Sequence, residues 1–137
     1  MTILLILRFI WELPQNILGL FVRLWVRKKV LKTEYIHSRW FFNTPAFGVS
    51  LGSFVFYSDA ENPFVKINPD NKKHEFGHTI QSMIFGPLYI LVIGLPSISR
   101  VLYSLLYYRK HKRIWTHYYD GYPENWADRL GAKYFHG

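Results

Sequence analysis

The sequence predicts a mainly α-helical protein with a small β-hairpin, forming a single domain, residues 1–137, that contacts a membrane. Half of its 137 residues are apolar and only 19% are charged, against about 25% in an average soluble domain. The formal net charge is +8, and a basic, apolar chain suits either nucleic acid or an anionic membrane surface. The absence of cysteine excludes disulfides, thiol catalysis and cysteine-ligated metal sites.

Residues 1–32 predict an amphipathic helix followed by a basic cluster. The polar side chains recur mostly at steps of three, four or seven, on one helical face, and Pro14 predicts a kink or a second helix near Gln15. This segment either lies in the membrane interface, anchored by Trp11 and Trp25, or spans with its polar face turned inward; a buried helix of a soluble protein is the third alternative. The polar face comprises Arg8, Glu12, Gln15, Asn16, Arg23 and Arg27, and the basic cluster comprises Arg27, Lys28, Lys29 and Lys32.

Residues 33–73 predict loops and a β-hairpin. Turn-forming residues surround two segments rich in β-branched and aromatic residues, Phe47 to Tyr57 and Phe64 to Ile67, which predict two short strands. The two strands together carry one basic residue, Lys66. A nucleic-acid module would gather basic residues here, so nucleic acid is not an expected partner.

Residues 74–113 begin with the motif His74-Glu75-Phe76-Gly77-His78. Residues four apart share a helix face, so His74 and His78 can bind one metal ion through their imidazole nitrogens. Glu75 is then placed to accept a proton from a metal-bound water, as in zinc hydrolases. Gly77 is a poor helix former, and we expect another element to pack closely on that turn.

Residues 114–137 supply a candidate third ligand. Pro123 suits the first turn of a helix, and Glu124 and Asp128 are then four apart on one face. Glu124 is the expected third metal ligand, and Asp128 the carboxylate that orients a metal-bound histidine.

The H-E-x-x-H motif followed by a helix carrying E-x-x-x-D resembles the gluzincin metallopeptidases, which implies a minimal zincin-like fold. The resemblance gives His74, His78 and Glu124 as ligands of Zn²⁺, Glu75 as the general base and Asp128 as the supporting carboxylate. The forms H-E-F-G-H and E-N-W-A-D-R-L-G are closest to membrane-embedded members such as the CAAX-processing zinc peptidases. They are also similar to short bacterial membrane proteins with H-E-x-G-H-x-x-Q-S followed by G-P-L-Y and G-L-P-S. In the family a tyrosine or histidine stabilises the oxyanion, and the candidates by position are His117, Tyr118, Tyr119 and Tyr122. A strand before the active-site helix borders the substrate cleft, and the predicted strands lie in that place.

The segment between the ligands predicts an apolar helical hairpin. Met83 to Leu95 carries no charge, Gly94 to Ser97 is typical of a turn, and Ile98 to Tyr108 is again apolar before the basic run Arg109 to Arg113. A hairpin from about His74 to Tyr108 would enter the membrane, fully or as a re-entrant loop, and place both basic clusters beside the metal site. The positive-inside rule makes that side cytoplasmic, which predicts the bacterial inner membrane.

The sequence therefore predicts a membrane-bound zinc metalloendopeptidase acting on a peptide or protein substrate. The alternative from another class is a non-catalytic immunity, adaptor or assembly protein with a structural zinc site, which a fourth protein ligand such as His117 or His37 would favour. Hydrolysis of a lipid or another non-peptide bond is a third possibility.

Overall fold

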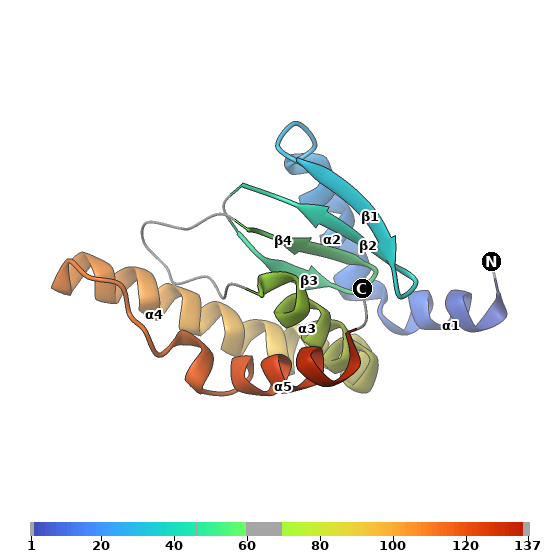
Figure 1. Ribbon diagram of the computed structural model, residues 1–137. Helices are drawn as coiled ribbons and strands as arrows, with labels where there is room; N and C mark the ends of the chain where they lie inside the picture. Colours follow the sequence, from blue (N-terminus) through green and yellow to red (C-terminus); the bar gives the residue numbers. More distant parts are fainter. Residues whose placement is uncertain (1, 46, 60–69, 136–137) are drawn as a thin grey trace.

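The computed structural model describes residues 2–45, 47–59 and 70–135. A four-stranded mixed sheet lies between helices on its two faces (Figure 1). The strands are β1 (Lys32–Ile36), β2 (Arg39–Asn43), β3 (Val49–Leu51) and β4 (Phe54–Tyr57), in the order β1-β2-β4-β3. β2 and β4 pair in parallel, and the other two pairings are antiparallel.

Alternation along β2 and β4 builds a core on each face of the sheet. Phe41 and Val55 are buried with Phe76 on the face covered by α3 (Asn71–Phe85) and α5 (Glu124–Tyr134). Phe42 and Phe56 are buried with Val26, at the end of α2 (Leu13–Trp25). Adjacent strand residues point to opposite faces, and two covered faces explain the consecutive apolar residues Trp40 to Phe42 in β2 and Phe54 to Tyr57 in β4.

The sheet is larger than the predicted hairpin. The segment Phe47 to Tyr57 forms the antiparallel pair β3 and β4, and the turn between them contains Gly52 at φ +65°. The first antiparallel pair, β1 and β2, was not predicted, because Lys32 to Asn43 holds charged residues and His37 among its strand formers. The predicted strand at Phe64 to Ile67 lies outside the described residues.

The N-terminal segment forms two helices, α1 (Ile3–Trp11) and α2, which meet at 85°. Pro14 lies in the first turn of α2, which confirms the prediction of a second helix near Gln15. Glu12, at this corner, is buried. Its carboxylate accepts a hydrogen bond from each terminal nitrogen of Arg39, both at 3.1 Å. Gln15 also donates to the Ser82 hydroxyl and the Gly86 carbonyl, each at 2.9 Å.

The turn predicted at Gly94 to Ser97 is absent. The chain turns earlier, at Gly86 (φ +55°), and runs through a 3₁₀ turn η1 (Gly86–Leu88) and a π-helical turn η2 (Ile90–Gly94) directly into α4 (Leu95–His111). Pro96 lacks an N–H, which frees the carbonyl four residues earlier, and Tyr122 donates its hydroxyl to that Val92 carbonyl at 2.8 Å. Helical residues 90–111 are long and apolar enough to cross a membrane, with 11% of the most apolar window buried.

Candidate metal centre

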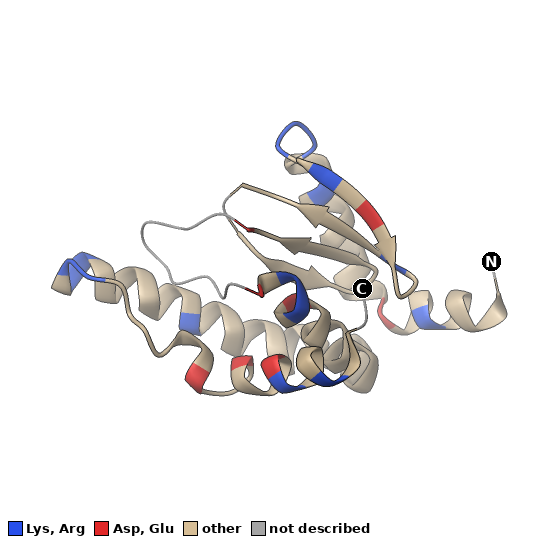
Figure 2. Cartoon of the chain, in the orientation of Figure 1, with Lys and Arg blue, Asp and Glu red and all other residues tan. Residues whose placement is uncertain are grey.

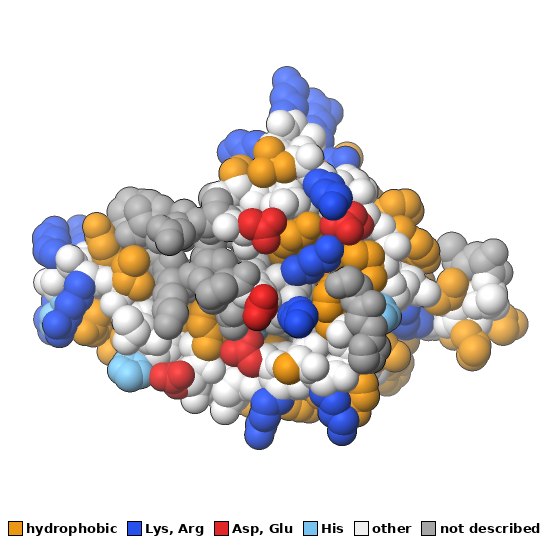
Figure 3. All heavy atoms as spheres, viewed as in Figure 1, with side chains coloured by type: hydrophobic (Ala, Val, Ile, Leu, Met, Phe, Trp, Pro, Cys, Tyr) orange, Lys and Arg blue, Asp and Glu red, His pale blue; other side chains and the backbone are white. Residues whose placement is uncertain are grey.

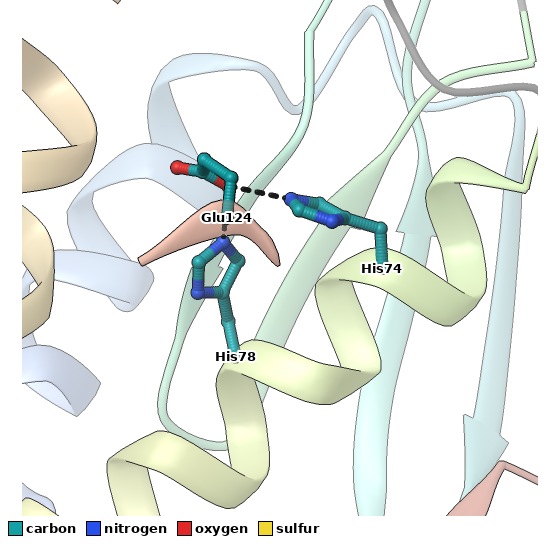
Figure 4. A group of neighbouring side chains, drawn as sticks. All are labelled: His74, His78 and Glu124. Carbon is teal, nitrogen blue, oxygen red and sulfur yellow. Dashed lines mark hydrogen bonds and ion pairs between the residues drawn. The ribbon is translucent and has the colours of Figure 1, made fainter. Parts of the chain in front are cut away.

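His74 and His78 lie one turn apart on α3 and point toward Glu124 at the start of α5 (Figure 4). One oxygen of Glu124, Oε2, lies 2.7 Å from His74 Nε2 and 2.9 Å from His78 Nε2. All three side chains are buried, and their candidate ligand atoms lie within 4.8 Å of one another. Two imidazoles and a carboxylate that converge in this way can hold a metal ion.

The second nitrogen of each imidazole is also engaged. His74 Nδ1 lies 2.8 Å from Asp128 Oδ1, and His78 Nδ1 lies 2.6 Å from Gln81 Oε1. Both oxygens accept hydrogen bonds, so each Nδ1 carries a proton. Each Nε2 donates to Glu124 when its ring is doubly protonated, and is the atom free to bind a metal ion when it is not. Gln81 also donates to the Pro123 carbonyl at 3.2 Å, and thereby ties the histidine helix to the residue before the third ligand.

The other oxygen of Glu124 is fixed by two hydroxyl groups. Its Oε1 accepts from Ser97 on α4, and from Tyr118 in the 3₁₀ turn η3 (Tyr118–Asp120) at 3.2 Å. The carboxylate is therefore held with Oε2 directed at the two histidines. Sequence spacing pointed to Glu124 itself, but it gave no indication of Ser97.

Close packing of α3 on α5 brings the ligands together. A Cβ added at Gly77 would lie 1.8 Å from the Ala127 carbonyl oxygen, and one added at Gly131 would lie 2.0 Å from the Lys73 carbonyl oxygen. The two helices approach so closely that only glycine fits at these positions. This confirms the expectation that another element packs on the turn containing Gly77.

The buried histidines and Glu124 shift one another's pKa values. Burial lowers the pKa of His74, but hydrogen bonds with Asp128 and Glu124 outweigh it and raise that pKa to about 10. Burial raises the pKa of Glu124, yet the charge of His78 and hydrogen bonds from both histidines hold it well below its ordinary value. A metal ion would take the place of the protons that now offset the Glu124 charge.

Glu75 faces a cavity beside the histidines. The cavity has a volume of about 270 Å³, and aliphatic side chains from α2, β3, η2 and α4 contribute to its lining. Burial raises the pKa of Glu75, and a Cβ added at Gly48 would lie 2.8 Å from Glu75 Oε1. Two buried polar atoms among the described residues lining the cavity lack a hydrogen-bond partner, Glu75 Oε2 and Ser50 Oγ. The lining of the cavity therefore combines aliphatic side chains with two residues, Glu75 and Ser50, that each carry an unpaired polar atom.

The four candidates for oxyanion stabilisation lie in different places. Tyr118 lines the cavity, and the ring of Tyr119 stands edge-on to His74 with centroids 4.8 Å apart. Tyr122 is exposed and bonded to η2, and His117 is 70% exposed and paired with Asp120 at 2.7 Å. Of the four, Tyr118 is the one that lines the cavity.

The edge of the sheet borders the same cavity. β3 is the last strand in the sheet order, and Val49, Ser50 and Leu51 all line the cavity. The hydroxyl of Tyr89, a residue that sequence reasoning did not single out, donates to the Ser50 carbonyl at 2.9 Å. Tyr89 also lines the cavity, so one acceptor of this strand already has an internal partner.

No family model, curated protein or solved structure matches this chain. The gluzincin resemblance consequently rests on the motif residues themselves. The ligand cluster is a feature of the structure, whereas the identity of the metal and the reaction are matters for proposal.

Proposed function

We propose that this protein is a membrane-bound zinc metallopeptidase, in which His74, His78 and Glu124 hold Zn²⁺. The proposal rests chiefly on Glu75, which lines a cavity next to three converging ligands and whose buried Oε2 lacks a hydrogen-bond partner. Two nitrogens and one carboxylate oxygen are the donor set of catalytic zinc sites, which keep one position open.

Bound zinc would polarise the scissile carbonyl and acidify a water molecule in the cavity. Glu75 accepts the proton of the attacking water and returns it to the leaving amine. Tyr118 is the candidate that donates a hydrogen bond to the developing oxyanion, and to do so its hydroxyl has to turn away from Glu124 Oε1. Asp128, Gln81 and Ser97 hold the ligands in place.

The substrate is a peptide or protein reached at the membrane, on the side that the positive-inside rule makes cytoplasmic. β3 would receive it as an added strand through main-chain hydrogen bonds. Because Tyr89 occupies the Ser50 carbonyl, pairing along the whole strand requires its phenol ring to move. The aliphatic walls of the cavity would receive an apolar side chain next to the cleaved bond.

A structural zinc site is the second candidate function, and it would need a fourth protein ligand. Within residues 2–45, 47–59 and 70–135, the candidate metal-binding group consists of His74, His78 and Glu124 alone. The two histidines considered as a fourth ligand lie elsewhere: His117 pairs with Asp120, and the ring of His37 lies 4.8 Å from that of Phe76. This arrangement favours an open position and hence catalysis.

The test compares wild type with Glu75→Gln for zinc content and for cleavage of a fluorogenic peptide library in the presence of lipid vesicles. Zinc content should persist while cleavage falls by about 10²-fold to 10⁴-fold. Glu34→Gln is the matched control, because it makes the same change at a residue that does not line the cavity, and it should leave both unchanged. Equal cleavage by wild type and Glu75→Gln would refute the hydrolytic assignment.

A further inference from the structure

Large apolar side chains are exposed along α1, α2 and α4. Leu4 is 73% exposed, Trp25 78% and Leu106 64%, and each has exposed apolar neighbours on its own helix. Soluble monomers rarely expose apolar patches of this extent to water. These helix faces therefore require an apolar environment.

The charges around these faces are basic. Residues 95–113 contain no Asp or Glu, and Glu12, the sole acid in residues 1–33, is buried against Arg39. Figure 2 shows Lys and Arg gathered at the loop that follows α2 and at the far end of α4. Apolar helices bordered by cations and lacking exposed acids complement an anionic lipid surface, whereas a second copy would bring like charges together.

The N-terminal helices do not form one crossing. α1 has nine residues, a length of about 14 Å at 1.5 Å per residue, less than half of the hydrocarbon thickness of about 30 Å. Joining α1 to α2 in a straight helix would require the 85° corner to open. That corner is fixed by the buried pair of Glu12 and Arg39.

The chain that follows α4 folds back along it. Arg100 on α4 donates to the carbonyls of Tyr118 and His117 at 2.8 and 2.7 Å, and Trp115 packs on Tyr103 with ring centroids 4.6 Å apart. This return segment is irregular, and it exposes the side chains of His117 and Asp120. The hydrocarbon core excludes irregular backbone and exposed charge, so α4 with its return segment does not fit across a bilayer.

We propose that α1, α2 and α4 lie within one leaflet of an anionic membrane, with the basic clusters among the headgroups and no helix crossing. Leu18 of α2 and Ile98 and Leu102 of α4 are exposed and also line the cavity, so the cavity borders the leaflet. The face that Figure 3 shows, which includes α3 and α5, carries acidic and basic side chains side by side. The proposal does not depend on metal binding or hydrolysis.

Because the chain has no cysteine, single cysteines can report on which side of a membrane each site lies. The variants Thr2→Cys, Lys28→Cys, Lys110→Cys and Lys133→Cys of the full chain are expressed in bacteria and treated with a membrane-impermeant maleimide in sealed inverted and right-side-out vesicles. Docking in one leaflet predicts that all four label from the same side. Labelling of Thr2→Cys or Lys110→Cys from the side opposite to Lys133→Cys would overturn the proposal.

Sedimentation with vesicles tests the lipid partner directly. The purified chain should bind vesicles of 30% phosphatidylglycerol in phosphatidylcholine. Lys29→Gln/Lys110→Gln should bind them about 30-fold more weakly, and Arg129→Gln/Lys133→Gln on α5 should bind like wild type. Three results would contradict the proposal: wild type binding pure phosphatidylcholine vesicles as tightly as the anionic ones, the two double variants losing the same affinity, or the chain forming a lipid-free oligomer that does not bind vesicles.

Discussion

Helices α3 and α1 invert the usual relation between polarity and burial. Nine of the fifteen residues of α3 are buried, and most of them are polar, including His74, Glu75 and His78. None of the nine residues of α1 is buried, although all but Arg8 are apolar. A polar interior is stable only when its groups have partners, and an apolar exterior is stable only outside water. The comparison separates a buried cluster that could hold a metal ion from an apolar surface that water does not suit.

The largest loss of stability is expected at the corner between α1 and α2. Arg39→Leu leaves the buried carboxylate of Glu12 without its bidentate partner and should destabilise the fold by about 3–5 kcal/mol. The measurement is chemical unfolding in detergent micelles. The double variant Glu12→Leu/Arg39→Leu, which removes both charges, should recover at least half of the loss; a double variant as unstable as the single one would contradict this account.

The next effect concerns the packing of α3 on α5. Gly77→Ala forces a Cβ against the Ala127 carbonyl, at 1.8 Å before relaxation, and should cost about 1–3 kcal/mol of unfolding free energy. Gly94→Ala is the matched control on an apolar helical turn, where the nearest atom would be 3.8 Å away. Equal stability of the two variants would show that α3 and α5 are not packed this closely.

A smaller effect is expected where α4 contacts the candidate metal ligand Glu124. Ser97→Ala removes one of the two hydroxyl groups that hold Glu124 Oε1, and zinc affinity measured by competition with a chelator should fall about tenfold. The effect is limited because Tyr118 still donates to the same oxygen. Ser104→Ala, whose hydroxyl bonds within α4, should bind zinc like wild type, and a Ser97→Ala affinity equal to wild type would remove Ser97 from this role.

The smallest effect belongs to a partly exposed ion pair between β1 and the first turn of α3. A hydrogen bond from Lys72 lowers the pKa of Glu34 below its ordinary value of 4.5. The resulting stabilisation is complete above that ordinary value and is lost as the pH falls through the lower folded-state pKa. Glu34→Gln should cost less than about 1 kcal/mol at pH 7. This difference from wild type should shrink as the medium is acidified through that range, and a constant difference would contradict the pair's role.

The sequence was most informative where chemistry imposes a spacing. Four-residue separations on helices placed His74 beside His78 and Glu124 beside Asp128, and the structure brings these four side chains together. Gln81 was missed, although its position three residues after His78 on the same helix face could have suggested it. Ser97 and Tyr89 reach the site from elements distant in sequence, and no local pattern encodes such contacts.

The position of the turn before α4 was harder to predict. Gly94, Pro96 and Ser97 are typical of a turn, yet the π-helical turn before them and the Tyr122 hydroxyl accommodate the proline within a continuous helix. The chain turns instead at Gly86, where a Cβ would lie 2.0 Å from the Trp11 ring. Glycine is required at position 86 because of a tryptophan on a helix more than seventy residues earlier, and a local sequence pattern does not predict such a contact.

The central claim is that His74, His78 and Glu124 bind one zinc ion with a position left open. X-ray absorption at the zinc edge on the purified, zinc-loaded full chain tests it most directly. The account predicts one zinc per chain, with two imidazole nitrogens at about 2.0–2.1 Å and oxygen ligands completing the shell, and loss of one oxygen ligand or of the metal in Glu124→Ala. A third imidazole in the shell, or an unchanged spectrum and zinc content in Glu124→Ala, would contradict it.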